Sequence, residues 1–449
     1  MKNINTTGMV KFNSYYIICF LLFLGCVTTA CKKESVFLER PKPELIIKSD
    51  NPRLKSKAIH FVKDTVYVLQ VSMVIDSGQI LKVDAGTLIK VNINHSIIVK
   101  PGGRIEAEGN QQEPIVFTVR TDKGGGGAET AERGGDSKTS WKGVWIYGSA
   151  ASPNSGRLRY VRIEFAGTAN SPENASLYLN NVGNQTGLDH IQVSYSRQPA
   201  FEFNGGNVNA SNLVAYATYM SDFVLNNGYK GRLQHLLALR HPYTFFGNEN
   251  GGLLLKDPET LPIVSNVTVI GPDNQKGFTF TSGGNPNAGI IGMLGARFHI
   301  RNSAVLGFPI GGLQIDGLGT AIALRDGESS IMHSVFHSNQ SNRAYYINPS
   351  SGTGYTSTQL EAFLVVRNNA KYTHSSKFLL NSPFDYYGTN SPDPSPSSDS
   401  PLLAGARFED VLDDPFFKKV NYRGALGAGA DNWLQGWTNF VPLQTNYNF

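Results

Sequence analysis

The stretch Gly156-Arg-Leu-Arg-Tyr-Val-Arg-Ile-Glu-Phe-Ala-Gly167 alternates large apolar and polar residues between two glycines. Alternation with a period of two is typical of a strand that buries one face. Variants recur down the chain, each with a polar or aromatic residue just before a short β-prone run. These residues are Tyr160, His190, Asn212, His235, Asn266, Asn302 and His333, and the first intervals between them are 30, 22 and 23 residues. Such a recurrence indicates stacked structural repeats.

A second series, Leu179, Phe201, Phe223 and Phe245, recurs at intervals of 22 residues. One such interval has room for two or three short strands, whereas a propeller blade needs four antiparallel strands in roughly 40 residues. Helical apolar patterns of useful length are nearly absent after the N-terminus. The sequence therefore predicts an all-β protein, a single-stranded right-handed parallel β-helix in which each rung buries its inward face against its neighbours.

The first 31 residues have the pattern of a secretory signal. Lys2 and Lys11 precede the apolar run Tyr15–Gly25, and the small residues Thr28-Thr-Ala30 lead to Cys31. The apolar run is too short for a spanning helix. Cys31-Lys-Lys-Glu resembles the start of a mature bacterial lipoprotein, so we expect Cys31 to carry lipid. Phe23-Leu-Gly-Cys26 is a rival site, and an ordinary soluble export signal is the alternative.

Cysteine usage and charge restrict the class of protein. All three cysteines (Cys19, Cys26 and Cys31) lie in the signal region, so an exported body without disulfides must be stabilised by its core. The net charge is +5, with acids and bases interspersed, which gives no case for nucleic acid as a partner. We expect a monomer that is attached to the membrane through an N-terminal lipid anchor.

The remaining chain divides by composition. We expect residues 32–64 to form a tether that leads into the fold, residues 65–390 the β-helix, and residues 391–401 a Pro/Ser loop. An open solenoid end exposes unpaired backbone edges, so the aromatic segment 402–449 is predicted to cap the last rungs. Insertions are predicted at Gly247–Pro262, Gly271–Ala288 and Gly307–Gly319.

Several strings in the chain occur together in one known type of protein. They are Ala85–Lys90, Gly102–Gly109, Pro114–Thr118, Trp141–Gly148 and Leu158–Gly167, followed near the end by Tyr422–Gly427 and Trp433–Phe440. In this order they resemble the parallel β-helix lipoproteins of unknown function that are common in Bacteroidetes-type bacteria. The resemblance implies the fold and a lipid anchor on the outer membrane, and it implies no chemistry.

Catalysis is the rival hypothesis, because pectate lyases and polygalacturonases are parallel β-helices; a shared fold is only an analogy. A hydrolase needs two nearby carboxylates, and a calcium-dependent lyase needs several around the ion and a base. The repeat region is poor in acids, and the main candidates are Asp189, Asp222, Asp316, Asp326 and Glu328. Arg325, Asp326 and Glu328 form the candidate cluster, although the same string suits an exposed turn.

No catalytic residue, cofactor or metal ligand is assigned from the sequence. His190, His235 and His333 recur at one rung position, which favours a stacked ladder over metal ligands, because local zinc motifs have much shorter spacings. Tyr216, Tyr219, Tyr229 and Tyr243 could stack on sugars, but core or lateral positions are favoured.

The expected function is that of a lipid-anchored protein of the cell envelope, on the outer membrane and facing the periplasm or the surface. It would act as a non-catalytic binding, adhesion or scaffold protein with a glycan or a surface protein as its ligand. The alternative is a polysaccharide lyase or glycoside hydrolase of the pectin-lyase-like β-helix type.

Overall fold

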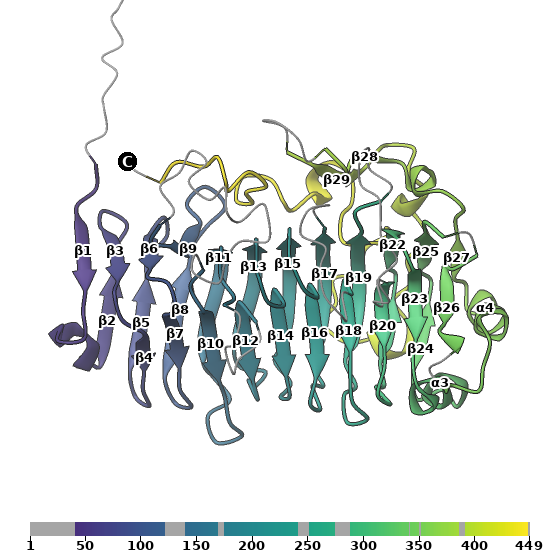
Figure 1. The fold of residues 1–449 in the computed structure, drawn as a ribbon, viewed down its shortest axis with the longest axis horizontal. Helices are drawn as coiled ribbons and strands as arrows, with labels where there is room; N and C mark the ends of the chain where they lie inside the picture. The colour runs from purple at the N-terminus through teal and green to yellow at the C-terminus, as the bar shows by residue number, and fades with distance from the viewer. Residues whose placement is uncertain are drawn as a thin grey trace, which may run out of the picture. The chain divides into compact units, whose positions relative to one another are not determined.

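The computed structural model describes residues 41–121, 140–168, 175–240, 251–273, 288–340, 342–349, 352–385 and 391–447. Cys31, the predicted lipidation site, and Tyr243 lie outside these residues, as does Phe245. Within residues 42–448, short parallel strands stack rung upon rung from β1 to β27 (Figure 1). The prediction of an all-β right-handed parallel β-helix is confirmed.

A complete rung contributes one strand to a first sheet and two strands, or the two halves of one long strand, to a second sheet. Within the described residues the first sheet has 10 strands and the second has 17. The 10-stranded sheet consists of β4 (Met73–Ile75), β7 (Ser96–Val99), β10 (Gly143–Tyr147), β12 (Leu177–Asn180), β14 (Phe201–Asn204), β16 (Phe223–Asn226), β18 (Leu253–Leu255), β20 (Ala288–Gly292), β23 (Gly311–Ile315) and β26 (Tyr345–Ile347). The 17-stranded sheet consists of β1 (Glu44–Ile47), β2 (Ala58–Phe61), β3 (Val66–Leu69), β5 (Ile80–Val83), β6 (Leu88–Val91), β8 (Arg104–Glu108), β9 (Ile115–Val119), β11 (Gly156–Glu164), β13 (Gly187–Ser194), β15 (Ala210–Tyr216), β17 (Arg232–Leu239), β19 (Ile263–Ile270), β21 (His299–Arg301), β22 (Ala304–Phe308), β24 (Ser330–Met332), β25 (Val335–Ser338) and β27 (Ala370–Lys371).

The recurring residues found in the sequence are the corners of the rungs. In β11 and β13, Arg159 pairs with Asp189 and Val161 with Ile191, which aligns Tyr160 with His190. The same register continues through the later rungs. All seven residues have a positive φ between 49° and 57°: Tyr160, His190, Asn212, His235, Asn266, Asn302 and His333. Asparagine and histidine tolerate this left-handed conformation better than most residues, which explains their recurrence. We call this column the corner ladder.

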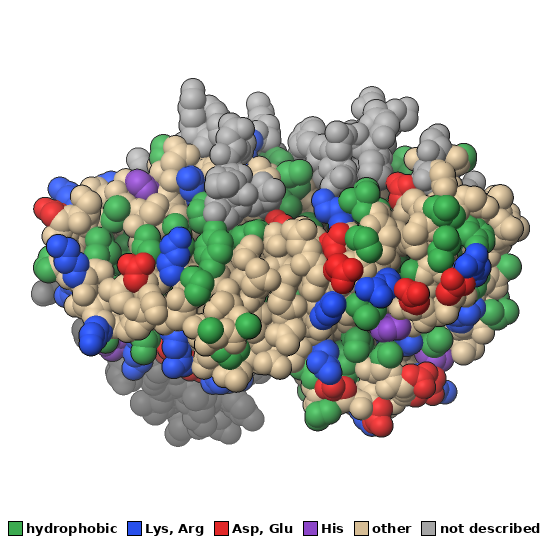
Figure 2. Space-filling view, turned by 90° about the horizontal axis from the view of Figure 1, so that it is seen from below, with side chains coloured by type: hydrophobic (Ala, Val, Ile, Leu, Met, Phe, Trp, Pro, Cys, Tyr) green, Lys and Arg blue, Asp and Glu red, His purple; other side chains and the backbone are tan. Residues whose placement is uncertain are grey.

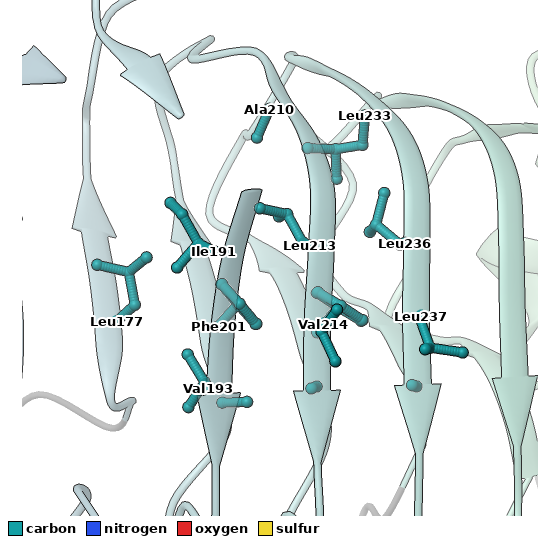
Figure 3. Close-up of a cluster of buried hydrophobic side chains, with 14 of the residues drawn as sticks. Leu177, Ile191, Val193, Phe201, Ala210, Leu213, Val214, Leu233, Leu236 and Leu237 are labelled. Atoms are coloured by element: carbon teal, nitrogen blue, oxygen red, sulfur yellow. The ribbon is translucent and has the colours of Figure 1, made fainter. Parts of the chain in front are cut away.

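The core lies inside the rungs, where apolar side chains from all strands of a rung meet. Ile191, Leu213 and Leu236 are aligned on successive rungs of the 17-stranded sheet and are fully or almost fully buried. Leu177 and Phe201 are aligned in the 10-stranded sheet and belong to the same core cluster (Figure 3). Since neighbouring rungs cover each other, the stack supplies the stability that no single rung has.

In the second series, the prediction aligned Leu179 with Phe201, and this alignment is wrong by two residues. Phe201 pairs with Phe223, but its partner on the preceding rung is Leu177, and Leu179 pairs with Phe203. After Phe223 the column continues at Leu253. Alternate residues of one strand face the same side, so a shift of two keeps the apolar pattern and conceals the error.

The β-helix begins and ends earlier than predicted. β1 and β2 lie in the segment predicted as a tether, where β1 pairs with β3 and β2 pairs with β5. The last strand of the parallel stack is β27, at Ala370–Lys371. The Pro/Ser segment 391–401 contains β29 (Asp393–Pro396), which pairs antiparallel with β28 (Leu380–Ser382). Proline is tolerated there because β29 is an edge strand.

The predicted insertions had mixed outcomes. Gly307–Gly319 is not an insertion, because it contains β23, which pairs with β20 as part of a regular rung. Gly311 and Gly312 resembled a loop in the sequence, yet they lie in this buried strand. Gly271–Ala288 falls largely outside the described residues. The described part of Gly247–Pro262 contains β18.

The C-terminal segment does not cap the last rungs as predicted. Residues 402–447, which we call the strap, run back along the outside of the 17-stranded sheet toward the first rungs (yellow in Figure 1). Side-chain amides hold its backbone in two-way hydrogen bonds. Asn302 bonds Arg407 at 2.9 Å in both directions, Gln234 bonds Lys418 at 2.8 Å, and Gln192 bonds Asn439 at 2.7 Å.

Two helices lie at the last rungs instead. α3 (Leu318–Arg325) follows β23, and α4 (Ser357–Val365) packs against β26 and buries Leu360 and Leu364. Short 3-10 turns complete the connections: η1 (Pro52–Lys55), η4 (Ser375–Phe378), η5 (Pro401–Leu403), η6 (Asp410–Leu412) and η7 (Gly429–Asp431). The helices cover the edge that the aromatic segment was expected to cover.

Candidate binding site

The outward faces of β8, β11 and β13 carry a row of charged side chains that we call the charged ribbon. Its members are Arg104, Glu106, Glu108, Arg157, Arg159 and Asp189. The strand register places Arg157 beside Glu106, and Arg159 beside both Glu108 and Asp189. Their neighbours Ala107 and Leu158 point into the core and are fully buried. Alternation along each strand thus puts every charge on one outer face.

Ion pairs link the ribbon across three rungs. Arg104 pairs with Glu106 within β8. Arg157 Nη1 lies 3.3 Å from Glu108 Oε2, and Arg159 Nε lies 3.4 Å from Asp189 Oδ2. The two arginine side chains remain about half exposed, at 57% and 49%. Their guanidinium groups therefore keep hydrogen-bond donors available to a ligand in solvent.

Asp189 is the most constrained acid of the ribbon. Its carboxylate accepts a hydrogen bond from Ser211 Oγ at 2.9 Å and lies 2.9 Å from His190 Nδ1. Burial raises the pKa of Asp189, but the contacts with His190 and Ser211 and the charge of Arg159 outweigh it, so the pKa is lowered overall. Asp189 therefore stays ionised near neutral pH and is a poor proton donor.

An aromatic cluster borders the ribbon along the corner ladder. The rings of Tyr160 and His190 stack with centroids 4.4 Å apart. Trp437 of the strap meets both rings edge-on, at 5.8 and 5.5 Å, and Trp433 lies 5.9 Å from His190. The Arg159 guanidinium lies 5.3 Å from the centre of the Tyr160 ring. The paired charges beside these packed rings form a surface that can bind sugar hydroxyl groups.

The predicted cluster of Arg325, Asp326 and Glu328 divides into two. Arg325 forms a bidentate ion pair with Asp326, at 2.6 and 2.7 Å, and donates to Tyr355 Oη at 3.2 Å. The hydrogen bond from Arg325 lowers the pKa of Asp326. Glu328 instead faces Arg297 at 3.7 Å. The two carboxylates thus belong to different pairs at the surface.

Arg325 also borders an apolar cavity of about 130 Å³ between α3, α4 and β26. The cavity is lined by Ile315, Ala321, Leu324, Arg325, Ile347, Tyr355, Gln359, Leu360 and Phe363. It contains one charged residue, and that charge is already paired with Asp326. The cavity therefore offers packing for an apolar group but no acid–base pair.

Another sequence candidate, Asp222, has a structural role. Asp222 and Arg240 are fully buried and pair at 2.9 Å, and Arg240 also donates to backbone carbonyls of Thr218 and Gly251. Burial, opposed by Arg240, raises the pKa of Asp222 to about 6. A fully buried carboxylate of this kind holds the rungs together and is closed to a polymeric substrate.

Three of the four tyrosines are buried, and the three histidines share one corner position. Tyr216, Tyr219 and Tyr229 are buried, at 2%, 6% and 0% exposure, so their rings pack within the protein. His190, His235 and His333 occupy the same corner position on different rungs. Among the residues that the structure describes, no three His, Cys, Asp or Glu side chains are grouped as metal ligands would be. Within the same residues, no helix is long and apolar enough to span a membrane.

Sequence reasoning missed the charged ribbon and the two strap tryptophans. Glu106 and Glu108, and likewise Arg157 and Arg159, are two residues apart, which is the signal for one face of a strand. The pairing of the two strands depends on a long intervening segment whose length gives no register. Nothing in the local sequence of Trp437 indicates that it contacts Tyr160.

Comparison with known protein families gives one match. Residues 53–375 match the family model described as a pectate-lyase-like beta helix domain. No curated protein and no solved structure matched the chain. The matched range begins within the first rung and ends just after β27.

Proposed function

The chain belongs to the family of pectate-lyase-like β-helix domains, and from that premise we propose that it is a lipid-anchored protein of the cell envelope that binds a glycan without cleaving it. The charged ribbon is the proposed binding surface. The observation that carries the proposal is the combination of half-exposed Arg157 and Arg159 with the Tyr160 and His190 rings at its border.

The ribbon is suited to binding because its charges are arranged before any ligand arrives. Ion pairs and the Ser211 hydrogen bond fix Asp189, and the aromatic cluster limits the motion of Tyr160. A prearranged surface loses little conformational entropy when it binds a ligand. Guanidinium and carboxylate groups can donate to and accept from sugar hydroxyl groups.

The same geometry argues against hydrolysis at the ribbon. A glycoside hydrolase needs one carboxyl group that is protonated at working pH and a second that is ionised. The pKa of Asp189 is lowered, and Glu106 and Glu108 are each paired with an arginine. Asp189 is thus an acceptor of hydrogen bonds rather than a donor of protons.

The lipid anchor rests on the sequence pattern that ends at Cys31. A cysteine directly after an apolar run and small residues is the pattern of lipoprotein processing, and acyl chains would place the protein on a membrane. We propose the outer membrane as the site. Mass spectrometry of the N-terminal peptide of protein extracted from membranes tests this part. An unmodified Cys31 would refute it.

A glycan array probed with the mature protein tests the binding function. The double variant Arg157→Ala/Arg159→Ala should lose most of the signal, because it removes the exposed donors. The matched control Lys377→Ala/Lys419→Ala changes exposed basic residues far from the ribbon in sequence and should bind like the wild type. Each bound glycan is then incubated with the protein, and its length is measured. Shortened chains would favour the lyase or hydrolase, and an array without any signal would refute glycan binding.

A further inference from the structure

The end of the β-helix formed by the first rung is distinctly basic. Residues 41–64 contain six basic and three acidic residues, and so contribute +3 to the chain's net charge of +5. Lys48, Arg53, Lys55 and Lys57 are exposed on and around η1. Among the described residues, none of these four side chains is ion-paired with a carboxylate. Figure 2 shows Lys and Arg side chains at this end, on the left, where Asp and Glu are fewer than toward the other end.

The same end exposes large aliphatic side chains. Ile46 on β1 and Val62 after β2 are exposed by 40% and 36%. Their neighbours Ile47 and Phe61 are buried in the core. Basic side chains interspersed with exposed aliphatic ones are the chemistry of a surface that lies against a bilayer. The cations bind lipid phosphates, and the aliphatic groups enter the headgroup region.

The chain connects this end directly to the predicted anchor. Ten residues separate Cys31 from Lys42, so the backbone from one to the other spans at most about 40 Å. Two copies meeting through this end would bring like charges together, which disfavours a dimer as the occupant. A basic patch beside a lipid anchor is a common second attachment to an anionic membrane.

We propose that the first-rung end, comprising Lys48, Arg53, Lys55, Lys57, Ile46 and Val62, binds the surface of an anionic lipid bilayer. This inference rests on the proposed function only in that the anchor at Cys31 brings the end close to the membrane. The contact makes the rungs stack away from the bilayer. The charged ribbon, which begins at β8 two strands after β2, then runs away from the lipid headgroups along the stack.

Lysine reactivity in the native protein tests the proposal. Protein purified from membranes is reconstituted into vesicles of phosphatidylcholine alone or of phosphatidylcholine with phosphatidylglycerol. It is then treated with a limiting amount of an amine-acetylating ester, and the products are mapped by mass spectrometry. Lys48, Lys55 and Lys57 should react roughly fivefold more slowly on the anionic vesicles, because each basic residue gains about 1 kcal/mol near such a surface. High salt should restore their reactivity.

The exposed lysines Lys377, Lys418 and Lys419 serve as internal controls and should react equally on both kinds of vesicle. Equal rates for the first-rung lysines on both vesicles would overturn the proposal, and so would slowing of both sets. The variant Lys48→Glu/Lys55→Glu/Lys57→Glu should also lose the slowed amide hydrogen exchange of β1 and β2 on anionic vesicles. Lys377→Glu/Lys418→Glu/Lys419→Glu should keep it.

The two proposals fail in different ways. An unacylated Cys31 refutes the lipid anchor, and the lysine measurement is then repeated with protein added to preformed vesicles. Slower reaction of the three first-rung lysines in that arm still supports a bilayer contact. An acylated protein whose first-rung lysines react at the same rate on both vesicles keeps the anchor and refutes the contact.

Discussion

The 17-stranded sheet has two outer faces, which lie on either side of the corner ladder and differ in how they meet solvent. Before the ladder, the charged ribbon is exposed, and its charges pair with one another. After the ladder, outward positions carry Val68, Val214 and Leu237, and all three are buried. The strap lies over this second face, where Phe440 meets Tyr216 at 5.1 Å and Tyr447 packs with Val68.

The difference shows that an outward apolar face in a solenoid requires a cover. A flat apolar sheet face left in water would be a site of aggregation. The charged face satisfies its own groups and remains free for a ligand. The apolar face is instead covered by the C-terminal segment of the same chain. Buried polar contacts position this segment, such as the hydrogen bonds that Tyr447 donates to Glu164 at 2.8 and 2.9 Å.

Deleting residues 402–449 should have the largest effect on this comparison. The deletion uncovers the apolar face. It also removes the backbone groups that form hydrogen bonds with the side chains of Gln192, Gln234 and Asn302. We expect the product to aggregate rather than elute as a soluble monomer in size-exclusion chromatography. A soluble monomer with an unchanged Tm would show that the strap does not stabilise the face.

Asn266→Ala should have the next largest effect. The Asn266 side chain is fully buried and donates to the carbonyls of Tyr422 and Gly424, at 2.9 and 3.2 Å. Alanine leaves both carbonyls unpaired and disfavours a φ of 56°, so unfolding should become easier by about 2–4 kcal/mol in denaturant titration. Asn266→Gly keeps the backbone conformation accessible and should recover about 1 kcal/mol. Equal losses in both variants would contradict a role for the left-handed corner.

The junction of ladder and strap should weaken in acid through His235. His235 is buried, and its Nε2 lies 3.2 Å from Tyr422 Oη. Burial, helped by the charges of Lys418 and His190 and opposed by Asp189, lowers the pKa of His235 to about 3. The unfolded chain takes up a proton near pH 6.5, and the folded chain does so only near pH 3. Stability is therefore complete above pH 6.5 and is lost as the pH falls, by about 2 kcal/mol at pH 5.

His235→Asn checks this pH dependence. Asparagine occupies the equivalent corner at Asn212 and Asn266, so it fits the left-handed backbone. Between pH 6.5 and 5 the free energy of unfolding of the variant should fall less steeply than that of the wild type. The difference in slope should correspond to about one proton fewer taken up on unfolding. Parallel curves for the two proteins would exclude His235 as the titrating group.

Arg157→Ala should have the smallest effect on stability. Its ion pair with Glu108 is about half exposed on both sides, and such pairs contribute about 0–1 kcal/mol. The Tm measured by calorimetry should therefore stay close to that of the wild type, whereas glycan binding should weaken. A large drop in Tm would mean that the ribbon is a structural element rather than a binding surface.

The fold could be predicted from the sequence because its signal is local and repeated. Each rung needs a left-handed corner and a short alternating strand, and both leave residues at a fixed offset, as at His190 and Asn212. The candidate site was less predictable. Arg325 and Asp326 do pair as neighbours, but Glu328, two residues further on, faces Arg297 from another rung. Which residues of two rungs face each other depends on the length of the segment between them, and these lengths differ from rung to rung.

The sequence alone determined the parallel coil, since periodic alternation and corner residues suffice to specify a rung and its stacking on the next. Only the tertiary structure decided the path of residues 402–447, which looked like an end cap. That segment has no period of its own, and its contacts, such as Tyr447 with Glu164, join residues 283 positions apart. The position of an aperiodic segment depends on which face of the finished helix is left apolar, and that face exists only once the rungs have stacked.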